Sequence, residues 1–283
     1  MKTMVFLADL FAEDYVGGAE LTTEAIVGGS NSKTSISKIR CAELNKDTIN
    51  NFKDNHWIIF NFSQLNSDLK LHLIKNVDYS IVEYDYKFCE FRSIELHKLK
   101  TSKPCDCVHK KENKINLAFY GYAKRIWFMS DKQKSIFLEN VKTIKEENTQ
   151  TLNSAFSDGD IRFINSIKDN EKDENFLIVK SNSWVKGYEN CVKYAQDNKL
   201  KYEVVSSLPY HELLIKLSTS RGLIFLPDGA DTCPRLVMEA QVLGCDLILN
   251  ERVQHQDEPW FNNGESCLEH MRTRVSTFWS YYE

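Results

Sequence analysis

Residues suited to binding a phosphate and a pentose gather in the stretch Pro227–Gly244, "PDGADTCPRLVMEAQVLG". Pro234 favours the first turn of a helix, where free backbone N–H groups and the positive end of the helix dipole suit an anion. A carboxylate at Glu239, further along that helix, can accept hydrogen bonds from the two vicinal hydroxyls of a ribose. Asp231, ahead of the helix, can reach a group attached beyond the phosphates. Helical spacing places Glu239 on the shoulder of a buried face formed by Leu236, Val237, Ala240 and Leu243.

The same residues have a simpler interpretation that spacing alone leaves open. Arg235 and Glu239 lie four residues apart and could form a surface ion pair, which stabilises a helix by roughly 0.3–0.5 kcal/mol. Asp231 could be a turn or capping residue.

Three other places hold glycines or charged residues at the ends of expected strands and helices. Gly17 and Gly18 precede a helix, where small residues let backbone N–H groups approach a ligand, although a turn explains them equally well. Lys186 follows a strand-like run and would otherwise be a solvated helix lysine. Asp85 ends the strand-like run 79–84 and could equally be a turn acid.

Five residues of metal-binding type occur between positions 89 and 109: Cys89, His97, Cys105, Cys107 and His109. Zinc prefers such thiolate and imidazole ligands, but no paired CxxC is present, and cysteines separated by one residue fit a tetrahedral site less readily. We therefore expect a reduced, partly buried loop and assign no metal site, with zinc as the alternative.

Another metal-binding pattern, Asp-x-Asp, occurs at Asp158 and Asp160. It does not follow a buried strand, and we interpret these two acids as turn and N-cap residues of a helix.

Length and composition limit the class of protein. At 283 residues the chain is long enough for two modest domains, because single cores usually stop growing near about 250 residues. The 42% hydrophobic and 27% charged content indicates a globular protein. A net charge of -4 gives no basic field, so we expect no nucleic-acid partner. No apolar run approaches the about 18 residues that cross a bilayer, which leaves only peripheral membrane contact open.

The opening residues, "MKTMVFLADLFAEDYVGG", indicate a first strand rather than a secretion signal. We therefore expect a cytoplasmic protein whose eight cysteines are mostly reduced.

Apolar strand-like runs alternate with helix-like stretches along the chain, which predicts an α/β protein with parallel sheets. Between residues 138 and 160 the sequence turns polar, and we place the domain joint there, with domains at 1–148 and 149–265 and a C-terminal helix, 266–283, that may pack back on the first. The expected strands are 4–8, 34–39, 57–62, 79–84 and 126–130, then 175–180, 201–205, 222–226 and 245–250. The expected helices begin near Gly18, Asn66, Asp131, Asp160, Trp184, Pro209 and Pro234. Two such doubly wound, Rossmann-like domains facing each other would create a cleft at the carboxyl ends of their strands.

The stretch 227–250 resembles the signature of the retaining glycosyltransferases of family 4, which have the GT-B fold: an acid, seven residues, then Glu-Ala in a helix, a glycine and a strand. The resemblance implies that Glu239 binds the ribose of a nucleotide sugar. It implies that Asp231, which stands where the family usually has Glu, contacts the hydroxyls of the donor sugar. The start of the helix at Thr232, Cys233 and Arg235 would neutralise the diphosphate.

Three further segments resemble the same family. "DYVGGAELTTEAI" is similar to its first glycine loop and assigns ligand contact to Gly17 and Gly18. "VKSNSWVKGYENCVKYA" is similar to the start of the donor domain and assigns diphosphate contact to Lys186, with Ser181 at the place of a usual arginine. "YSIVEYDYKFCEFRS" is similar to a strand that ends in His-Asp beside the transferred sugar, and has Tyr84-Asp85 there.

The resemblance implies transfer of a sugar from a nucleoside diphosphate sugar to a hydroxyl of a glycan or lipid-linked glycan in polysaccharide biosynthesis. Configuration at the anomeric carbon would be retained, with Asp231, Lys186 and Asp85 as the catalytic residues and with no cofactor and no metal. A non-catalytic nucleotide-sugar-binding or partner protein of the same fold stays open, because Tyr84, Ser181 and Asp231 depart from the pattern. An epimerase of this fold would need further acid and base residues.

Overall fold

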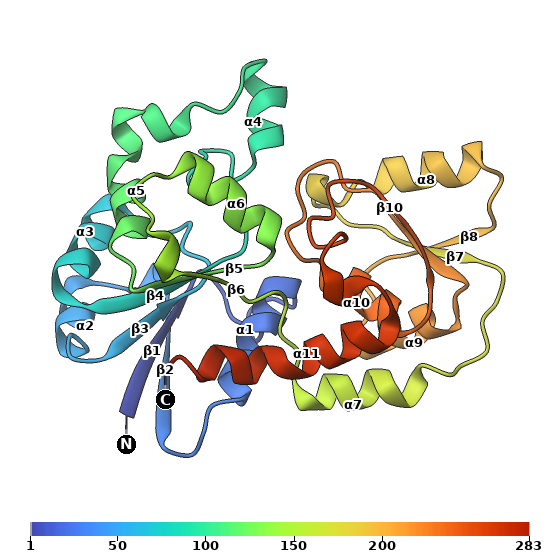
Figure 1. Ribbon diagram of the computed structural model, residues 1–283, viewed down its shortest axis with the longest axis horizontal. Helices are drawn as coiled ribbons and strands as arrows, with labels where there is room; N and C mark the ends of the chain where they lie inside the picture. Colours follow the sequence, from blue (N-terminus) through green and yellow to red (C-terminus); the bar gives the residue numbers. More distant parts are fainter. Residues whose placement is uncertain (1, 283) are drawn as a thin grey trace. The chain divides into compact units, whose positions relative to one another are not determined.

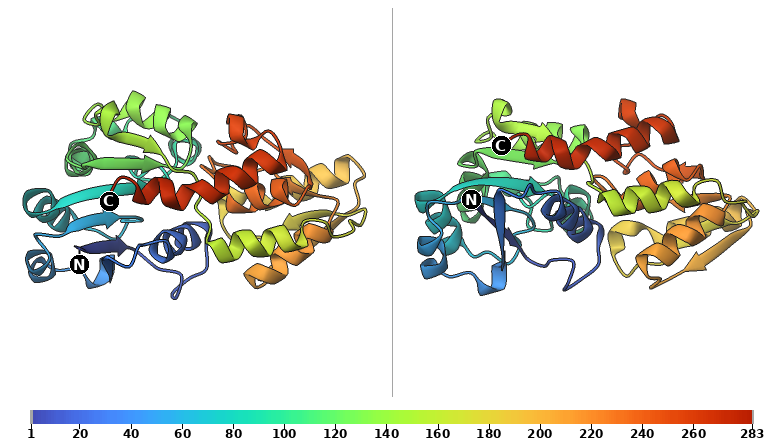
Figure 2. Two further views of the ribbon diagram at one scale, coloured as in Figure 1. Left: turned by 60° about the horizontal axis from the view of Figure 1, so that its bottom comes forward. Right: turned by 90° about the horizontal axis from the view of Figure 1, so that it is seen from below.

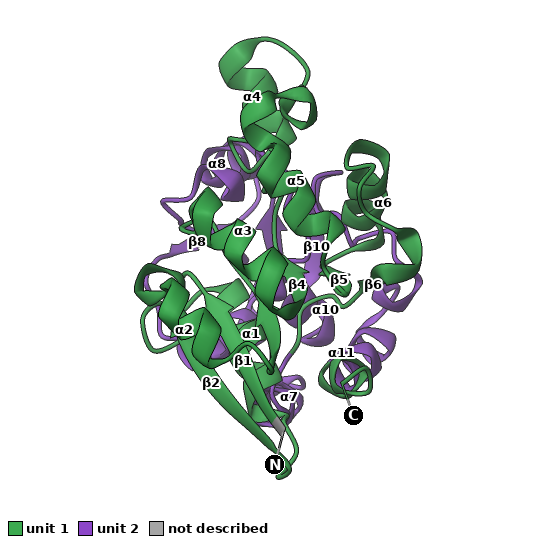
Figure 3. Cartoon of the chain, turned by 90° about the vertical axis from the view of Figure 1, so that its left-hand side faces the viewer, with its two compact units in different colours: residues 1–155, 275–283 green, residues 156–274 purple. Residues whose placement is uncertain are grey.

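The computed structural model describes residues 2–282 and divides the chain into two compact units, coloured separately in Figure 3. Unit 1 comprises residues 1–155 and 275–283, and unit 2 comprises residues 156–274. The first boundary lies later than the expected one at residue 148, because Thr149–Thr151 forms a strand, β6, that pairs with β5 of the first sheet. The second boundary lies inside the last helix, α11, rather than at its start.

Unit 1 is built on a six-stranded parallel sheet in the order β2-β1-β3-β4-β5-β6 (Figure 1). Since β1 lies between β2 and β3, the connections change direction there, and the carboxyl ends of β1 and β3 form the switch point where such sheets bind ligands. The strands are β1 (Lys2–Ala8), β2 (Thr34–Arg40), β3 (His56–Ile59), β4 (Asp78–Glu83), β5 (Arg125–Phe128) and β6 (Thr149–Thr151).

Helices cover both faces of this sheet, which explains why its central strands are apolar throughout rather than alternating. On one face Tyr79 of β4 stacks on Phe119 of α5 with ring centroids 4.8 Å apart. On the other face Phe6 of β1 stacks on Trp279 near the end of α11, whose indole nitrogen donates to the Ile26 carbonyl of α1 at 2.8 Å. The end of α11 therefore packs within unit 1, beside β1 and α1, as Figure 2 shows.

Two helices of unit 1, α3 and α6, begin at polar caps where the sequence predicts them. Asn66 and Ser130 each accept a backbone N–H of the helix that follows, which satisfies one of the donors left free in the first turn. Three short helices, α2, α4 and α5, and the strand β6 were not predicted. The helices are α1 (Gly18–Gly28), α2 (Lys46–Asn51), α3 (Ser67–Asn76), α4 (Ile94–Thr101), α5 (Lys114–Gly121) and α6 (Asp131–Asn140), with 3-10 turns η1 (Cys41–Glu43), η2 (Cys107–His109), η3 (Lys111–Asn113) and η4 (Glu146–Asn148).

Unit 2 is built on a four-stranded parallel sheet in the order β10-β9-β7-β8, and its switch point lies between β7 and β9. All four strands were predicted. They are β7 (Phe176–Val179), β8 (Tyr202–Val205), β9 (Gly222–Phe225) and β10 (Asp246–Leu249). The helices are α7 (Asp158–Ile167), α8 (Tyr188–Asp197), α9 (Tyr210–Thr219), α10 (Arg235–Val242) and α11 (Gly264–Trp279), with 3-10 turns η5 (Trp184–Lys186) and η6 (Pro259–Phe261).

The prediction of two Rossmann-like α/β domains is therefore confirmed. Among residues 2–282, none of the helices combines the length and the apolar character needed to span a bilayer.

Candidate functional site

The switch point of unit 2 brings Lys186 and Asp231 together. Lys186 ends η5, which follows β7, and Asp231 lies in the loop that follows β9. The Lys186 Nζ atom donates to Asp231 Oδ2 at 2.6 Å, and the two side chains are 37% and 11% exposed. Both therefore remain within reach of a ligand from solvent.

The position of Lys186 is fixed by a close approach of the chain to the end of β9. Gly187 has φ +61°, and a Cβ atom there would lie 1.9 Å from the Leu226 carbonyl oxygen, so only glycine fits. Next to it, the Asp228 N–H donates to the Val185 carbonyl at 2.9 Å. Asp231 is held from the other side, since its N–H donates to the Arg252 carbonyl at 2.9 Å.

Glu239 lies in the interior of unit 2, not on the shoulder of its helix as predicted. Only 2% of the residue is exposed, and Met238 beside it is also buried, whereas Leu236 is half-buried. The α10 helix packs against β9, β10, α7 and α9, so it is covered on almost every side and no polar face remains. Glu239 Oε1 accepts a hydrogen bond from the Tyr210 hydroxyl of α9 at 2.7 Å.

Arg235 is the charged partner of Glu239, with its Nε atom 3.7 Å from Glu239 Oε1. The ion pair expected at the surface is buried instead, because its two side chains are 4% and 2% exposed. The guanidinium also donates to the Tyr210 hydroxyl at 3.1 Å and lies 3.8 Å from the centre of the Phe156 ring. Burial raises the pKa of Glu239 above its usual range, while the Arg235 charge acts in the opposite direction.

Asp160 belongs to this buried group and is not the N-cap of α7 as predicted. Ser157 is the N-cap, and Asp160 is the third residue of a capping box, donating its backbone N–H to Ser157 Oγ at 3.0 Å. Its Oδ2 atom accepts a hydrogen bond from Arg235 at 3.2 Å. Asp158, by contrast, is exposed on the first turn.

The start of α10 adds backbone donors to this region. Pro234 is its N-cap residue, one position earlier than the first helical residue, Arg235. Thr232 and Cys233 are buried, at 7% and 6% exposure. Diphosphate contact by these residues stays a prediction.

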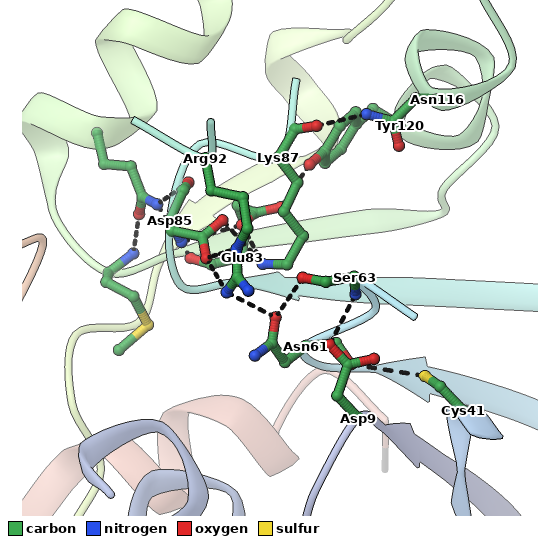
Figure 4. A network of polar contacts seen from close by, with 12 residues as sticks. Asp9, Cys41, Asn61, Ser63, Glu83, Asp85, Lys87, Arg92, Asn116 and Tyr120 are labelled. Atoms are coloured by element: carbon green, nitrogen blue, oxygen red, sulfur yellow. Dashed lines mark hydrogen bonds and ion pairs between the residues drawn. The ribbon is translucent and has the colours of Figure 1, made fainter. Parts of the chain in front are cut away.

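A second polar group lies at the carboxyl end of β4 in unit 1 (Figure 4). Asp85 was predicted there, and its carboxylate accepts hydrogen bonds from Arg92 Nε at 2.7 Å and from Lys87 Nζ at 3.1 Å. Sequence reasoning missed Glu83, which is fully buried and accepts hydrogen bonds from Lys87 Nζ at 2.7 Å and from the Tyr120 hydroxyl at 2.5 Å. Glu83 could have been found from the sequence, because it is an acid at the end of an apolar strand and a lysine follows it four residues later.

Glu83 and Asp85 are two residues apart, yet their pKa values are shifted in opposite directions. Burial raises the pKa of Glu83, and the Lys87 charge only partly offsets it. Burial also acts to raise the pKa of Asp85, but Lys87 and Arg92 together outweigh it and the pKa of Asp85 is lowered. Asp85 therefore stays ionised, and its side chain is 23% exposed.

The glycines predicted for ligand contact lie at the other side of the unit 1 switch point. Gly17 is the extended N-cap residue of α1, and Gly18 is its first helical residue. A Cβ atom on Gly17 would lie 2.5 Å from Oε2 of the flexible Glu20 side chain. The structure connects α1 to the end of β4 through a 2.9 Å hydrogen bond between the hydroxyls of Thr23 and Tyr84.

At the carboxyl end of β1, Asp9 is a further buried acid that the sequence analysis did not select. Its carboxylate accepts the backbone N–H groups of Ser63 at 2.8 Å and of Gln64 at 3.0 Å, in the loop after β3. It fixes that loop at the switch point and therefore has a structural role (Figure 4).

A pocket of about 320 Å³ opens beside Lys87 and Arg92 in unit 1. Its wall combines hydroxyl, amide and charged side chains with the ring of Phe62, a lining suited to a polyhydroxylated ligand. The polar residues in its wall include Ser63, Ser67, Lys70, Glu90, Asn113 and Asn116.

No protein-family model and no curated protein match the chain. Solved structures do match it. HepE from Anabaena, solved with UDP and glucose, aligns with a TM-score of 0.60 and 9% identity over 100% of this chain and 98% of that one. Trehalose-6-phosphate synthase OtsA aligns with a TM-score of 0.61 and 9% identity over 97% and 91% of the two chains. A trehalose-6-phosphate protein from E. coli, bound with UDP-2-fluoro glucose, aligns with a TM-score of 0.59 and 8% identity over the same shares.

The chain has the fold of the GT-B glycosyltransferases. At identities near a tenth the likeness establishes the fold alone. In the GT-B fold of this chain, Lys186 and Asp231 lie at the switch point of the second sheet, and Asp85 follows a central strand of the first.

Proposed function

We propose that the protein is a retaining glycosyltransferase, which moves a sugar from a nucleoside diphosphate sugar to a hydroxyl of a glycan or lipid-linked glycan. The observation that supports this most is the 2.6 Å pair of Lys186 and Asp231 beside the start of α10. This arrangement offers a cation and helix N–H groups to a diphosphate and a carboxylate to sugar hydroxyls. The neighbouring structures that were solved with UDP, glucose or UDP-2-fluoro glucose support the same substrate class.

In this proposal the difficult step is cleavage of the bond between the anomeric carbon and the diphosphate. Negative charge grows on the leaving diphosphate as the bond breaks, and Lys186 with the first N–H groups of α10 would stabilise it. When the diphosphate binds, Lys186 would exchange its contact with Asp231 for the phosphate. The freed Asp231 carboxylate would then accept hydrogen bonds from the donor sugar.

Glu239 would reach a ribose only after its buried contacts rearrange, because Tyr210 and Arg235 occupy its Oε1 atom. Without that rearrangement Glu239 supports α10 and positions the residues at its start. This one observation favours the alternative of a non-catalytic partner protein, because a carboxylate held inside the fold would leave a nucleotide with fewer contacts.

For the acceptor, the polar pocket of unit 1 supports a glycan, because its hydroxyl and amide side chains match sugar hydroxyls. Asp85, beside this pocket, would contact the transferred sugar or the acceptor hydroxyl. We propose that transfer serves polysaccharide biosynthesis in the cytoplasm and needs no metal at this site.

The test is release of nucleotide from UDP, GDP and ADP sugars by the purified protein, with and without glycan acceptors. Transfer with one donor supports the proposal, and NMR of the product shows whether the anomeric configuration is retained. An Asp231→Asn variant should lose most of the transfer. An Asp246→Asn variant should keep it, because Asp246 pairs with Arg221 at the opposite end of the same sheet. Donor binding without release of nucleotide from any donor would select the non-catalytic alternative.

A further inference from the structure

Four side chains of metal-binding type converge in the long connection between β4 and β5: Cys89, His97, Cys105 and Cys107. We call them the thiol–imidazole cluster. Their ligand atoms all lie within 4.8 Å of one another. Cys89, His97 and Cys107 are each 2% exposed, and Cys105 is half-buried, so the cluster is largely shielded from bulk solvent, although Cys89 and Cys107 also line the pocket beside Lys87.

The two distances from His97 to sulfur match a tetrahedral zinc site. His97 Nδ1 lies 3.6 Å from Cys89 Sγ and 3.5 Å from Cys107 Sγ. Zinc bonds of about 2.3 Å to sulfur and 2.0–2.1 Å to nitrogen at tetrahedral angles separate the two ligand atoms by about 3.5 Å. A neutral imidazole nitrogen has one lone pair and accepts one S–H donor well, whereas two thiols approach this nitrogen. The Cys89 thiol also has the Ser93 carbonyl as an acceptor at 3.3 Å, and a cation at the centre of the cluster would hold both sulfurs at these distances from the imidazole.

Cys105 and Cys107 are separated by one residue, a spacing that the sequence analysis judged unfavourable for a tetrahedral site. A turn between them makes this spacing possible. Two residues of extended chain advance by about 6.6 Å, too far for adjacent ligands. Asp106 instead has φ -112° and ψ 10°, and η2 begins at Cys107. The bend at Asp106 brings both thiols to the same side.

Groups around the cluster favour a bound cation. The Glu90 backbone N–H donates to Cys107 Sγ at 3.5 Å. The other imidazole nitrogen, His97 Nε2, lies 3.8 Å from Asp106 Oδ1, and a carboxylate in that place orients metal-bound histidines. Three thiolates and Zn²⁺ carry a net charge of −1, and Lys110, which pairs with Glu90 at 2.7 Å, lies beside them.

The helix α4 has few apolar side chains to anchor it. In α4, whose residues are all described, His97 is the one buried side chain, and Leu99 is 73% exposed. The helix stands apart from those that cover the sheet (Figures 1 and 3). Small segments without enough core are commonly held by a structural metal.

We propose that the thiol–imidazole cluster binds one zinc ion in a closed structural site. The ion would join three places in the connection: the loop after β4, the helix α4 and the turn before η2. Arg92 lies between the first two of these places, so the site would also hold the loop that presents Arg92 to Asp85. This proposal does not depend on glycosyl transfer.

The experiment measures zinc by elemental analysis in protein purified without chelators from zinc-supplemented medium, and then the spectrum after exchange of zinc for Co²⁺. We expect one zinc per chain and the visible absorption of tetrahedral Co²⁺ with thiolate charge-transfer bands. Cys107→Ser should reduce the zinc content to less than about a tenth. Two matched controls should keep it: Cys41→Ser, a single buried thiol of the same unit, and His109→Ala, an exposed histidine of the same segment.

Three results would overturn the site. Wild-type protein could lack both zinc and the tetrahedral Co²⁺ spectrum. The cysteines of the cluster could be joined in a disulfide, seen as a mass loss that reduction reverses. Zinc could be lost equally from the two control variants. Because the first two results use only wild-type protein, the proposal stays testable if Cys107→Ser does not fold.

Discussion

The end of β4 in unit 1 and the end of β9 in unit 2 contain similar sets of charges in different settings. Each region has one buried ion pair between residues four apart, Glu83 with Lys87 and Arg235 with Glu239. Each also has one pair that faces solvent. Arg92 and Asp85 are 43% and 23% exposed, and Lys186 and Asp231 are 37% and 11% exposed.

The difference between buried and exposed pairs separates two kinds of role. A ligand from solvent can replace the partner of Asp85 or Asp231 more easily than the partner of a buried acid, because ion pairs with access to water contribute less than buried ones. Removing one partner of a buried pair leaves an uncompensated charge, which costs about 3–5 kcal/mol. The exposed acids are therefore the better candidates for substrate contact, and Glu83 and Glu239 for support.

The largest effect should follow from Lys87→Ala. Glu83 is fully buried, and losing the Lys87 charge should lower the free energy of unfolding by about 3–5 kcal/mol at neutral pH. Urea unfolding of unit 1, followed by its tryptophan fluorescence, measures this. Lys201→Ala, which breaks the exposed pair with Glu174, should leave stability unchanged. If the free energy of unfolding fell equally in the two variants, the buried pair would stabilise the protein no more than the exposed pair.

A smaller loss should follow from Gly187→Ala in unit 2. The left-handed backbone and the 1.9 Å approach to the Leu226 carbonyl leave no space for a methyl group. We expect a loss of about 1–3 kcal/mol and weaker nucleotide-sugar binding, because Lys186 is displaced. Gly28→Ala is the control, since a Cβ atom there meets no other atom within 4 Å. Unchanged donor affinity in Gly187→Ala by calorimetry would argue against a role for Lys186.

Much of the fold could be predicted because its signals are local. An apolar run such as 222–226 is by itself enough to predict a strand of a buried parallel sheet. A cap such as Asn66 marks the start of its helix. The strand β6, "TQT", is short and polar and is stabilised by pairing with β5, so nothing in its own composition indicates it. The last helix crosses the unit boundary, and its partner surface on β1 lies far away in the sequence.

The site could be predicted only where one segment carries its residues. Asp231 and Glu239 were found from their spacing, and the structure brings Lys186 to Asp231. The burial of Glu239 could not be predicted, because it depends on Tyr210, a residue of another helix without a distinctive pattern. Helical spacing describes one face of α10, whereas packing against several elements covers the rest.

A still smaller difference should appear only in the pH dependence of stability. Burial raises the pKa of Glu239 in the folded state, so its contribution is fully present below the unfolded pKa of about 4.3 and is lost as pH rises through the folded value. Glu239→Gln does not titrate, and its stability relative to wild type should therefore increase from pH 4 to pH 8. Urea unfolding across this range measures the difference. Glu212→Gln, an exposed position of the same unit, should show none.

The smallest loss of stability should follow from Arg92→Ala, which breaks the exposed pair in unit 1. Lys87 still contacts Asp85 at 3.1 Å, so unfolding should change by about 0–1 kcal/mol. Carboxyl NMR should nevertheless show a higher pKa for Asp85, because one of the two cations that lower it is lost. The stability that Asp85 contributes above its unfolded pKa would then be smaller, and on acidification it would be fully lost at a higher pH. Arg40→Ala, which breaks another exposed pair of unit 1, should leave the pKa of Asp85 unchanged. A loss as large as that of Lys87→Ala would mean that Arg92 supports the fold, and Asp85 would then be no freer than Glu83 to meet a substrate.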